Sequence, residues 1–186
     1  NEIVEKPEDA FIYPEKKPII VKPTIDKAAT KSSILSRKDF KVAKASFEAI
    51  KNKKWQTAIK ISKKAKNKIV YNLVNYLYLI QTSNAASFYD YLTFINSNPD
   101  YPRINRLKYL AEHKINLKTN SPKSILKWFK NNEPLSDFGK IKLGEVYIIE
   151  GKREKGEALI KEGWTKAKLN KSNLRYLRKK YKKIIT

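Results

Sequence analysis

The sequence predicts an all-α protein, in which helical hairpins pack as an α-solenoid (a tetratricopeptide-like superhelix) behind an extended N-terminal arm. Only five of the 186 residues are glycine, which suits helices and fits poorly with a β fold. From Arg37 onward, apolar residues recur at helical spacing in one stripe after another. The expected pairs of helices begin near Phe40, Ile69, Ile104 and Phe138, at intervals of 29, 35 and 34 residues. Such intervals are typical of stacked hairpins, each of which buries its stripe against its neighbours.

Residues 1–36 differ from the rest because they contain no apolar periodicity long enough for a helix. Four prolines and many charged residues occupy this segment, which is typical of an extended arm or linker. Two short apolar runs, at residues 11–13 and 19–21, predict either weak packing or docking along the helical body or a partner. We therefore divide the chain into an arm over residues 1–36 and a helical-repeat domain over residues 37–186.

Three apolar stripes, separated by short breaks, predict the first three helices. Residues 52–54 form the turn after the first stripe, and Asn67 interrupts the second. The third stripe is the most apolar, so we expect its helix to be buried on most sides. The stripes are Phe40, Ala43, Phe47 and Ile50; Trp55, Ala58, Ile59 and Ala65; and Val70, Leu73, Val74, Leu77 and Ile80.

A fourth helix and a proline corner follow in the middle of the chain. Ser87 is the expected N-cap, because its hydroxyl can accept from free backbone N–H groups. Pro99 should end the helix, since proline has no N–H and disfavours the helical conformation in the residue before it. We expect Pro102 to open the next helix, Asp100 to cap it, and Tyr101 to pack between the two hairpins.

End signals predict the last five helices. The fifth is expected over residues 103–115. Ser121, followed by proline, opens the sixth, and Ser136 caps the seventh. Gly151 is a C-terminal glycine that separates the seventh helix from the eighth. The ninth, over residues 170–185, is strongly basic.

The net charge of +23 has two possible explanations. One is a surface that meets a polyanion, such as nucleic acid, acidic lipid or the carboxylates of a cell wall. The other is codon bias, because only six of the 41 basic residues are arginine and Lys, Ile and Asn are abundant. Nucleic acid is the less favoured polyanion, since side chains that stack on bases are sparse in the ninth helix. The candidate polyanion-contacting residues are Arg175, Arg178, Lys179, Lys180, Lys182 and Lys183.

We expect no catalytic, cofactor-binding or metal-binding residue. The single histidine, His113, is interpreted as a surface or hydrogen-bonded side chain, and the absence of cysteine excludes thiolate metal sites. No glycine-rich phosphate loop exists, and Glu145 is expected in a solvated position. Trp55, Trp128 and Trp164 are interpreted as core anchors in preference to stacking platforms for sugar rings.

A series of short motifs runs through the helical region. It begins with Phe47 to Lys54 followed by Trp55 and Ala58, and continues with Ala85-Ala86-Ser87-Phe88 and the corner Asn98-Pro99-Asp100-Tyr101-Pro102. Trp128-Phe129, Gly151-Lys152, Glu157-Ala158-Leu159-Ile160 and Trp164 follow in order. Together these motifs resemble the N-terminal helical domain of soluble lytic murein transglycosylases, over about Phe40 to Thr186. The family usually has tryptophan where this chain has Tyr101.

The resemblance implies a role at the bacterial cell wall. Lytic transglycosylases cleave the bond between N-acetylmuramic acid and N-acetylglucosamine in peptidoglycan, using a glutamate, typically followed by serine, in a lysozyme-like domain. No glutamate of this chain is followed by serine. We therefore expect a non-catalytic domain that positions a separate lysozyme-like catalytic domain on murein strands in the periplasm. Because the chain contains no methionine, we expect Asn1 to follow a removed signal peptide or a cut.

Two other functions stay open from the sequence. A tetratricopeptide-like adaptor would hold a segment of a partner protein in its concave face. A basic repeat protein would bind RNA, with an affinity that falls steeply as salt rises.

Overall fold

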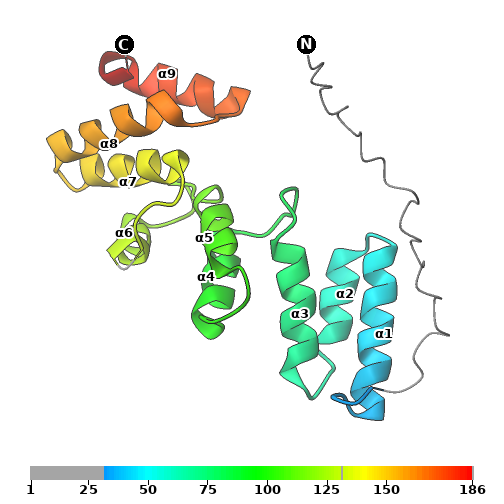
Figure 1. Cartoon of the computed structure of the whole chain (residues 1–186). Helices are drawn as coiled ribbons and strands as arrows, with labels where there is room; N and C mark the ends of the chain where they lie inside the picture. Colours follow the sequence, from blue (N-terminus) through cyan, green and yellow to red (C-terminus); the bar gives the residue numbers. More distant parts are fainter. Residues whose placement is uncertain (1–31, 131, 186) are drawn as a thin grey trace, which may run out of the picture.

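The computed structural model describes residues 32–130 and 132–185, and every regular element in this part of the chain is an α-helix (Figure 1). The predicted all-α class is therefore confirmed. Figure 1 shows α1–α3 grouped at one end of the described chain and α7–α9 at the other, with α4–α6 between them. The helices are α1 (Arg37–Lys51), α2 (Trp55–Ser62), α3 (Lys68–Leu79), α4 (Phe88–Ser97), α5 (Ile104–Glu112), α6 (Pro122–Lys130), α7 (Asp137–Ile149), α8 (Arg153–Lys166) and α9 (Lys171–Ile185).

The predicted arm is described only at its end. Residues 1–31 lie outside the described residues, and residues 32–36 contain no helix before the N-cap of α1. The solenoid superhelix stays a prediction. None of the described helices is both long and apolar enough to cross a membrane.

Helix ends follow the capping residues that the sequence predicts. The Ser87 hydroxyl accepts from the backbone N–H of Asp90, and the Asp90 carboxylate accepts in return from the backbone N–H of Ser87, so α4 begins with a capping box. The Ser136 hydroxyl accepts from the N–H of Gly139 at 2.9 Å and caps α7. Gly151 has φ +78°, the left-handed conformation that glycine adopts readily after a helix.

The proline corner is a structural joint, but it differs from the prediction at Asp100. The Tyr101 ring lies 4.9 Å from the Tyr76 ring of α3 and 5.2 Å from the Phe94 ring of α4, as centroid separations. Both ring contacts fall within the predicted pair of the third and fourth helices, so packing between two hairpins stays a prediction. Asp100 is exposed and does not cap α5. The reason is that Arg103, with φ +56°, occupies the N-cap position, so α5 begins at Ile104 and Pro102 lies before its N-cap.

The pairing of helices also differs in the middle of the chain. The sequence predicts pairs of the third with the fourth helix and of the fifth with the sixth. In the structure, α4 packs more extensively on α5 than on α3. The proline corner joins α4 and α5 directly, whereas residues 80–87 form a longer connection between α3 and α4.

Helices α7 and α8 make the closest hairpin in the described chain. A Cβ atom on Gly144 would lie 2.6 Å from the carbonyl oxygen of Gly156. A Cβ atom on Gly163 would likewise lie 2.5 Å from the carbonyl oxygen of Asp137. The two backbones therefore approach each other at positions where a side chain would hold them apart.

Three apolar clusters form the core. The first joins α1, α2 and α3 around Ala58 and Val74, both 0% exposed. The second and largest runs from α3 to α7 and includes the Trp128 ring. The third joins α7, α8 and α9 around Ile160. Trp128 is thus a core anchor, as the sequence predicts.

Candidate functional site

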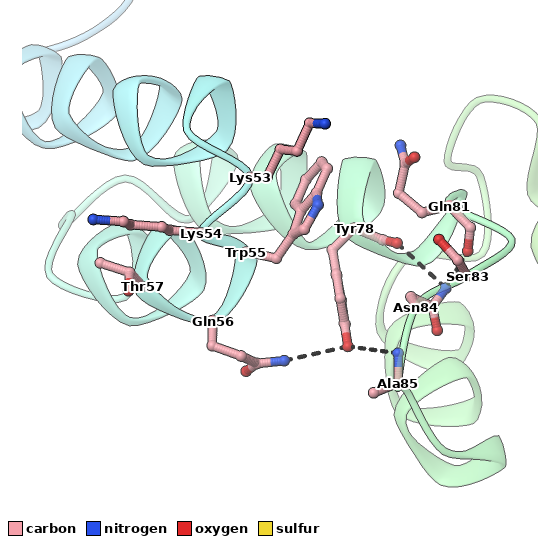
Figure 2. A pocket seen from close by; sticks show the side chains of 10 residues that line it. All are labelled: Lys53, Lys54, Trp55, Gln56, Thr57, Tyr78, Gln81, Ser83, Asn84 and Ala85. Carbon is pink, nitrogen blue, oxygen red and sulfur yellow. Dashed lines mark hydrogen bonds between the residues drawn. The ribbon is translucent and has the colours of Figure 1, made fainter.

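An aromatic cleft lies where α2 begins and α3 ends. Lys53 adopts a left-handed conformation with φ +58°, which reverses the chain sharply between α1 and α2. The reversal places Lys54 and the first residue of α2, Trp55, beside the last turn of α3. The connection from α3 to α4 closes the other side with Ser83 and Ala85 (Figure 2).

Two aromatic rings form the floor of this cleft. The centroids of Trp55 and Tyr78 are 6.0 Å apart, with the rings tilted by 43°. The Tyr78 hydroxyl accepts from the Gln56 side-chain amide at 3.2 Å and from the backbone N–H of Ala85 at 3.1 Å, as the dashed lines in Figure 2 show. Tyr78 is buried, whereas Trp55 is half-buried and borders the cavity.

The connection between α3 and α4 is fixed by hydrogen bonds. The buried Asn84 amide donates to the carbonyl oxygen of Leu79 at 3.0 Å and to the Tyr91 hydroxyl at 2.7 Å. The Tyr91 hydroxyl donates in turn to the same Leu79 carbonyl at 2.6 Å. Lys114, whose pKa is lowered by burial, donates to the backbone carbonyl of Asn84 at 2.6 Å. The wall of the cleft is therefore anchored to both α4 and the end of α5.

The cleft suits binding better than bond cleavage. Its volume of about 370 Å³ falls within the usual range of small-ligand pockets. The half-buried Trp55 ring can stack on an apolar face of a ligand, and nearby lysine, amide and hydroxyl groups can pair with hydroxyls or carboxylates. No Asp or Glu lines it, so it lacks the carboxyl pair that glycoside hydrolysis uses.

All six predicted polyanion-contacting residues lie on α9, and Arg175, Arg178, Lys179, Lys182 and Lys183 are exposed. At 3.6 residues per turn, Arg175, Arg178 and Lys179 share one side of the helix, and Leu177 is buried on the other side. The backbone of Tyr181 is not helical, with φ −122° and ψ 25°, so Lys182 and Lys183 follow a kink in α9. Arg178 also lies over the half-buried Trp164 ring, 5.9 Å from its centroid.

Lys180, the sixth, points elsewhere, toward a buried acid. Its ammonium group lies 2.8 Å from the Tyr176 hydroxyl and 3.4 Å from the carboxylate of Glu145. Burial alone would lower the pKa of Lys180, but Tyr176, Tyr181 and Glu145 together raise it above its usual value. Lys180 is therefore engaged within the fold.

The sequence analysis expected Glu145 in a solvated position, and this expectation is wrong because Glu145 is 0% exposed. The Lys142 ammonium donates to its carboxylate at 2.6 Å, and the hydroxyls of Tyr176 and Tyr181 donate at 2.8 and 3.1 Å. Burial raises the pKa of Glu145, but Lys142, Tyr176 and Lys180 outweigh burial and hold it below the usual value. The group joins α7 to α9, and its partners on α9 lie too far along the chain for the sequence pattern to reveal them.

A second buried carboxyl, at Glu112, also serves the fold. It accepts from the backbone N–H groups of Leu135 and Ser136, each at 2.7 Å, and from the Ser136 hydroxyl. Burial raises its pKa above the usual value despite these hydrogen bonds. The carboxyl therefore holds the end of α5 against the beginning of α7.

His113 is an exposed residue, in agreement with its interpretation as a surface side chain. Its ring is stacked on Phe138, with the planes 3° from parallel and centroids 5.4 Å apart. Burial, together with the nearby Arg106 charge, lowers its pKa. Across residues 32–130 and 132–185, no group of three or more His, Asp or Glu side chains is placed to hold a metal ion.

No protein-family model, no curated protein and no solved structure matches this chain. The resemblance to the helical domain of lytic transglycosylases therefore stays a prediction from the sequence motifs.

Proposed function

We propose that this chain is a non-catalytic, peptidoglycan-binding helical domain of a lytic transglycosylase. It would hold murein glycan strands in the periplasm and position a separate lysozyme-like catalytic domain on them. The observation that carries the proposal is the cleft of Trp55 and Tyr78, because an aromatic floor flanked by amides and lysines suits an amino sugar bearing a carboxylate.

The distribution of charge supports the same ligand. Lys53 and Lys54 are exposed at the rim of the cleft, and α9 carries further exposed cations. Murein carries carboxylates on muramic acid and on its stem peptides, so these cations would attract it over long range. Such attraction weakens as salt screens the charges.

Purified sacculi provide the direct test. We expect the protein to sediment with sacculi at low ionic strength, and Trp55→Ala to weaken this binding at least about fivefold through lost stacking. Trp164→Ala is the matched control, because Trp164 is also half-buried but lies outside the cleft. Circular dichroism would establish that both variants are folded. Absence of sedimentation at low salt, or equal loss in both variants, would contradict the proposal.

A paired charge substitution separates the cleft from the overall charge. Lys53→Ala with Lys54→Ala should weaken sacculus binding more than Lys63→Ala with Lys64→Ala. Both pairs are exposed, and each pair removes the same charge from an opposite end of α2. Equal effects would show that binding depends on net charge alone and would remove the cleft from the proposal. Tighter binding to RNA than to sacculi would favour the nucleic-acid alternative.

The proposal also predicts the absence of lytic activity. The protein alone should release no anhydro-muropeptides, the products of lytic transglycosylases, from sacculi. The reason is that no carboxyl group lines the cleft to protonate a glycosidic oxygen. Analysis of the soluble fraction by chromatography and mass spectrometry would check this. Release that depends on any glutamate of this chain would overturn the non-catalytic assignment.

A further inference from the structure

A second, more apolar groove lies between α6 and α7. Leu126 and Phe129 contribute to it from α6, and Leu143 and Tyr147 contribute from α7. Its volume of about 640 Å³ exceeds that of the aromatic cleft. Phe129 and Leu143 are only 9% and 7% exposed, while Leu126 and Tyr147 are half-buried, so the floor is continuous with the core and borders solvent.

The spacing along α6 explains how the groove acquires a basic rim. Lys123, Leu126, Lys127 and Lys130 recur at intervals of three and four residues, so they share one side of the helix. The opposite side carries residues such as Ile125, which is fully buried. This side of α6 thus presents one apolar residue, Leu126, among three exposed lysines.

The far edge of the groove is basic as well. Lys152 borders the groove, and the Lys155 ammonium lies over the Tyr147 ring, 4.5 Å from its centroid. Glu150 is the one acid among the lining residues. The groove lysines are exposed and form no ion pair with any described residue, namely Lys123, Lys127, Lys130 and Lys152. The Lys152 ammonium lies 5.9 Å from the centroid of the Tyr147 ring.

We propose that this groove binds an acidic amphipathic helix of a partner protein. The apolar floor accepts leucine-like side chains that repeat every three or four residues along the partner. Glutamate or aspartate residues flanking that stripe would pair with the lysines on both edges. A polyanion without apolar groups fits the groove less well, because it would leave the apolar floor unfilled. A second copy of this chain also fits less well, because its net charge of +23 would be repelled by the same lysines.

This inference goes beyond murein binding and does not depend on it. The groove belongs to α6 and α7, whereas the aromatic cleft belongs to α2, α3 and the connection to α4. A protein ligand in the groove and a glycan in the cleft would therefore occupy separate parts of the chain.

Selection from a random library of displayed peptides of about 16 residues, roughly four helical turns, tests the proposal. We expect the enriched peptides to combine an apolar stripe at helical spacing with flanking acids. The most enriched peptide, made with a fluorescent label, should bind the full chain. Lys127→Glu with Lys130→Glu should weaken this binding at least tenfold, as measured by fluorescence anisotropy.

Lys63→Glu with Lys64→Glu is the matched control, because it makes the same change in net charge on exposed lysines away from the groove. It should reduce binding less than threefold. Leu126→Asp, in a protein shown to be folded by circular dichroism, should also abolish binding. Three results would overturn the proposal: no enrichment of acidic amphipathic peptides, equal losses in the two lysine pairs, or self-association of the chain that Lys127→Glu abolishes.

Discussion

Replacing Glu145 by glutamine should destabilise the protein severely. The substitution keeps the shape of the side chain but removes the charge that pairs with the Lys142 ammonium at 2.6 Å. The Lys142 side chain is only 9% exposed, so its charge would stay buried without a counter-ion. Breaking a buried ion pair in this way costs about 3–5 kcal/mol in the free energy of unfolding.

Urea denaturation followed by circular dichroism measures this cost. With a urea dependence of about 2 kcal/mol per molar for a domain of this size, the midpoint should fall by about 1.5–2.5 M. Glu157→Gln is the matched control. Glu157 also pairs at 2.7 Å, but with the exposed Arg153, so its loss should cost less than about 1 kcal/mol.

A double variant distinguishes a buried ion pair from simple packing. Glu145→Gln combined with Lys142→Met removes both charges of the buried pair. Most of the lost stability should return, because the cation that remains, Lys180, is 43% exposed and can be hydrated. If the double variant were as unstable as Glu145→Gln, or if Glu145→Gln cost no more than Glu157→Gln, the electrostatic account of this cluster would be refuted.

Acid should reduce the penalty of Glu145→Gln. Because the folded pKa of Glu145 is lowered, its contribution is complete above the unfolded value of about 4.3 and is lost as pH falls through the folded value. The urea midpoints of the two proteins should therefore converge only at pH values below the unfolded pKa. Gly144→Ala should lower stability by about 1–3 kcal/mol, because the new methyl group meets the Gly156 carbonyl; an unchanged melting temperature would contradict the close approach. Ser87→Ala should cost about 1 kcal/mol through the lost cap, whereas Asp100→Ala should change stability by less than about 0.5 kcal/mol, and equal losses in urea titrations would contradict these assignments.

Local sequence signals predicted the helices and most of their ends. Ser87, Ser136 and Gly151 act as predicted, since capping depends on atoms within a few residues of the helix end. The predicted capping role of Asp100 is wrong because Arg103, in a left-handed conformation, is the N-cap of α5. The residue type does not reveal this, since arginine has no preference for that conformation.

The candidate sites were harder to predict from the sequence than the helices were. Trp55 was interpreted as a core anchor in preference to a platform for sugar rings, but it is half-buried and borders a cleft. That cleft also needs Tyr78 and Ala85, which tertiary packing brings beside Trp55. Glu145 was expected in solvent, because its neighbours in sequence do not include the tyrosines of α9 that donate to it. Long-range contacts of this kind leave no periodic trace in a single chain.

The anchored connection between α3 and α4 has a consequence for the kinetics of binding. Asn84 is held by Leu79, Tyr91 and Lys114 before any ligand arrives, so this wall of the cleft does not have to close during association. Encounter with a preformed site proceeds at about 10⁵–10⁷ per molar per second for a protein-sized partner, and favourable charge raises that rate. Differences in affinity among ligands of the cleft should then appear mainly in their residence times, which the floor rings and the rim lysines determine after contact is made.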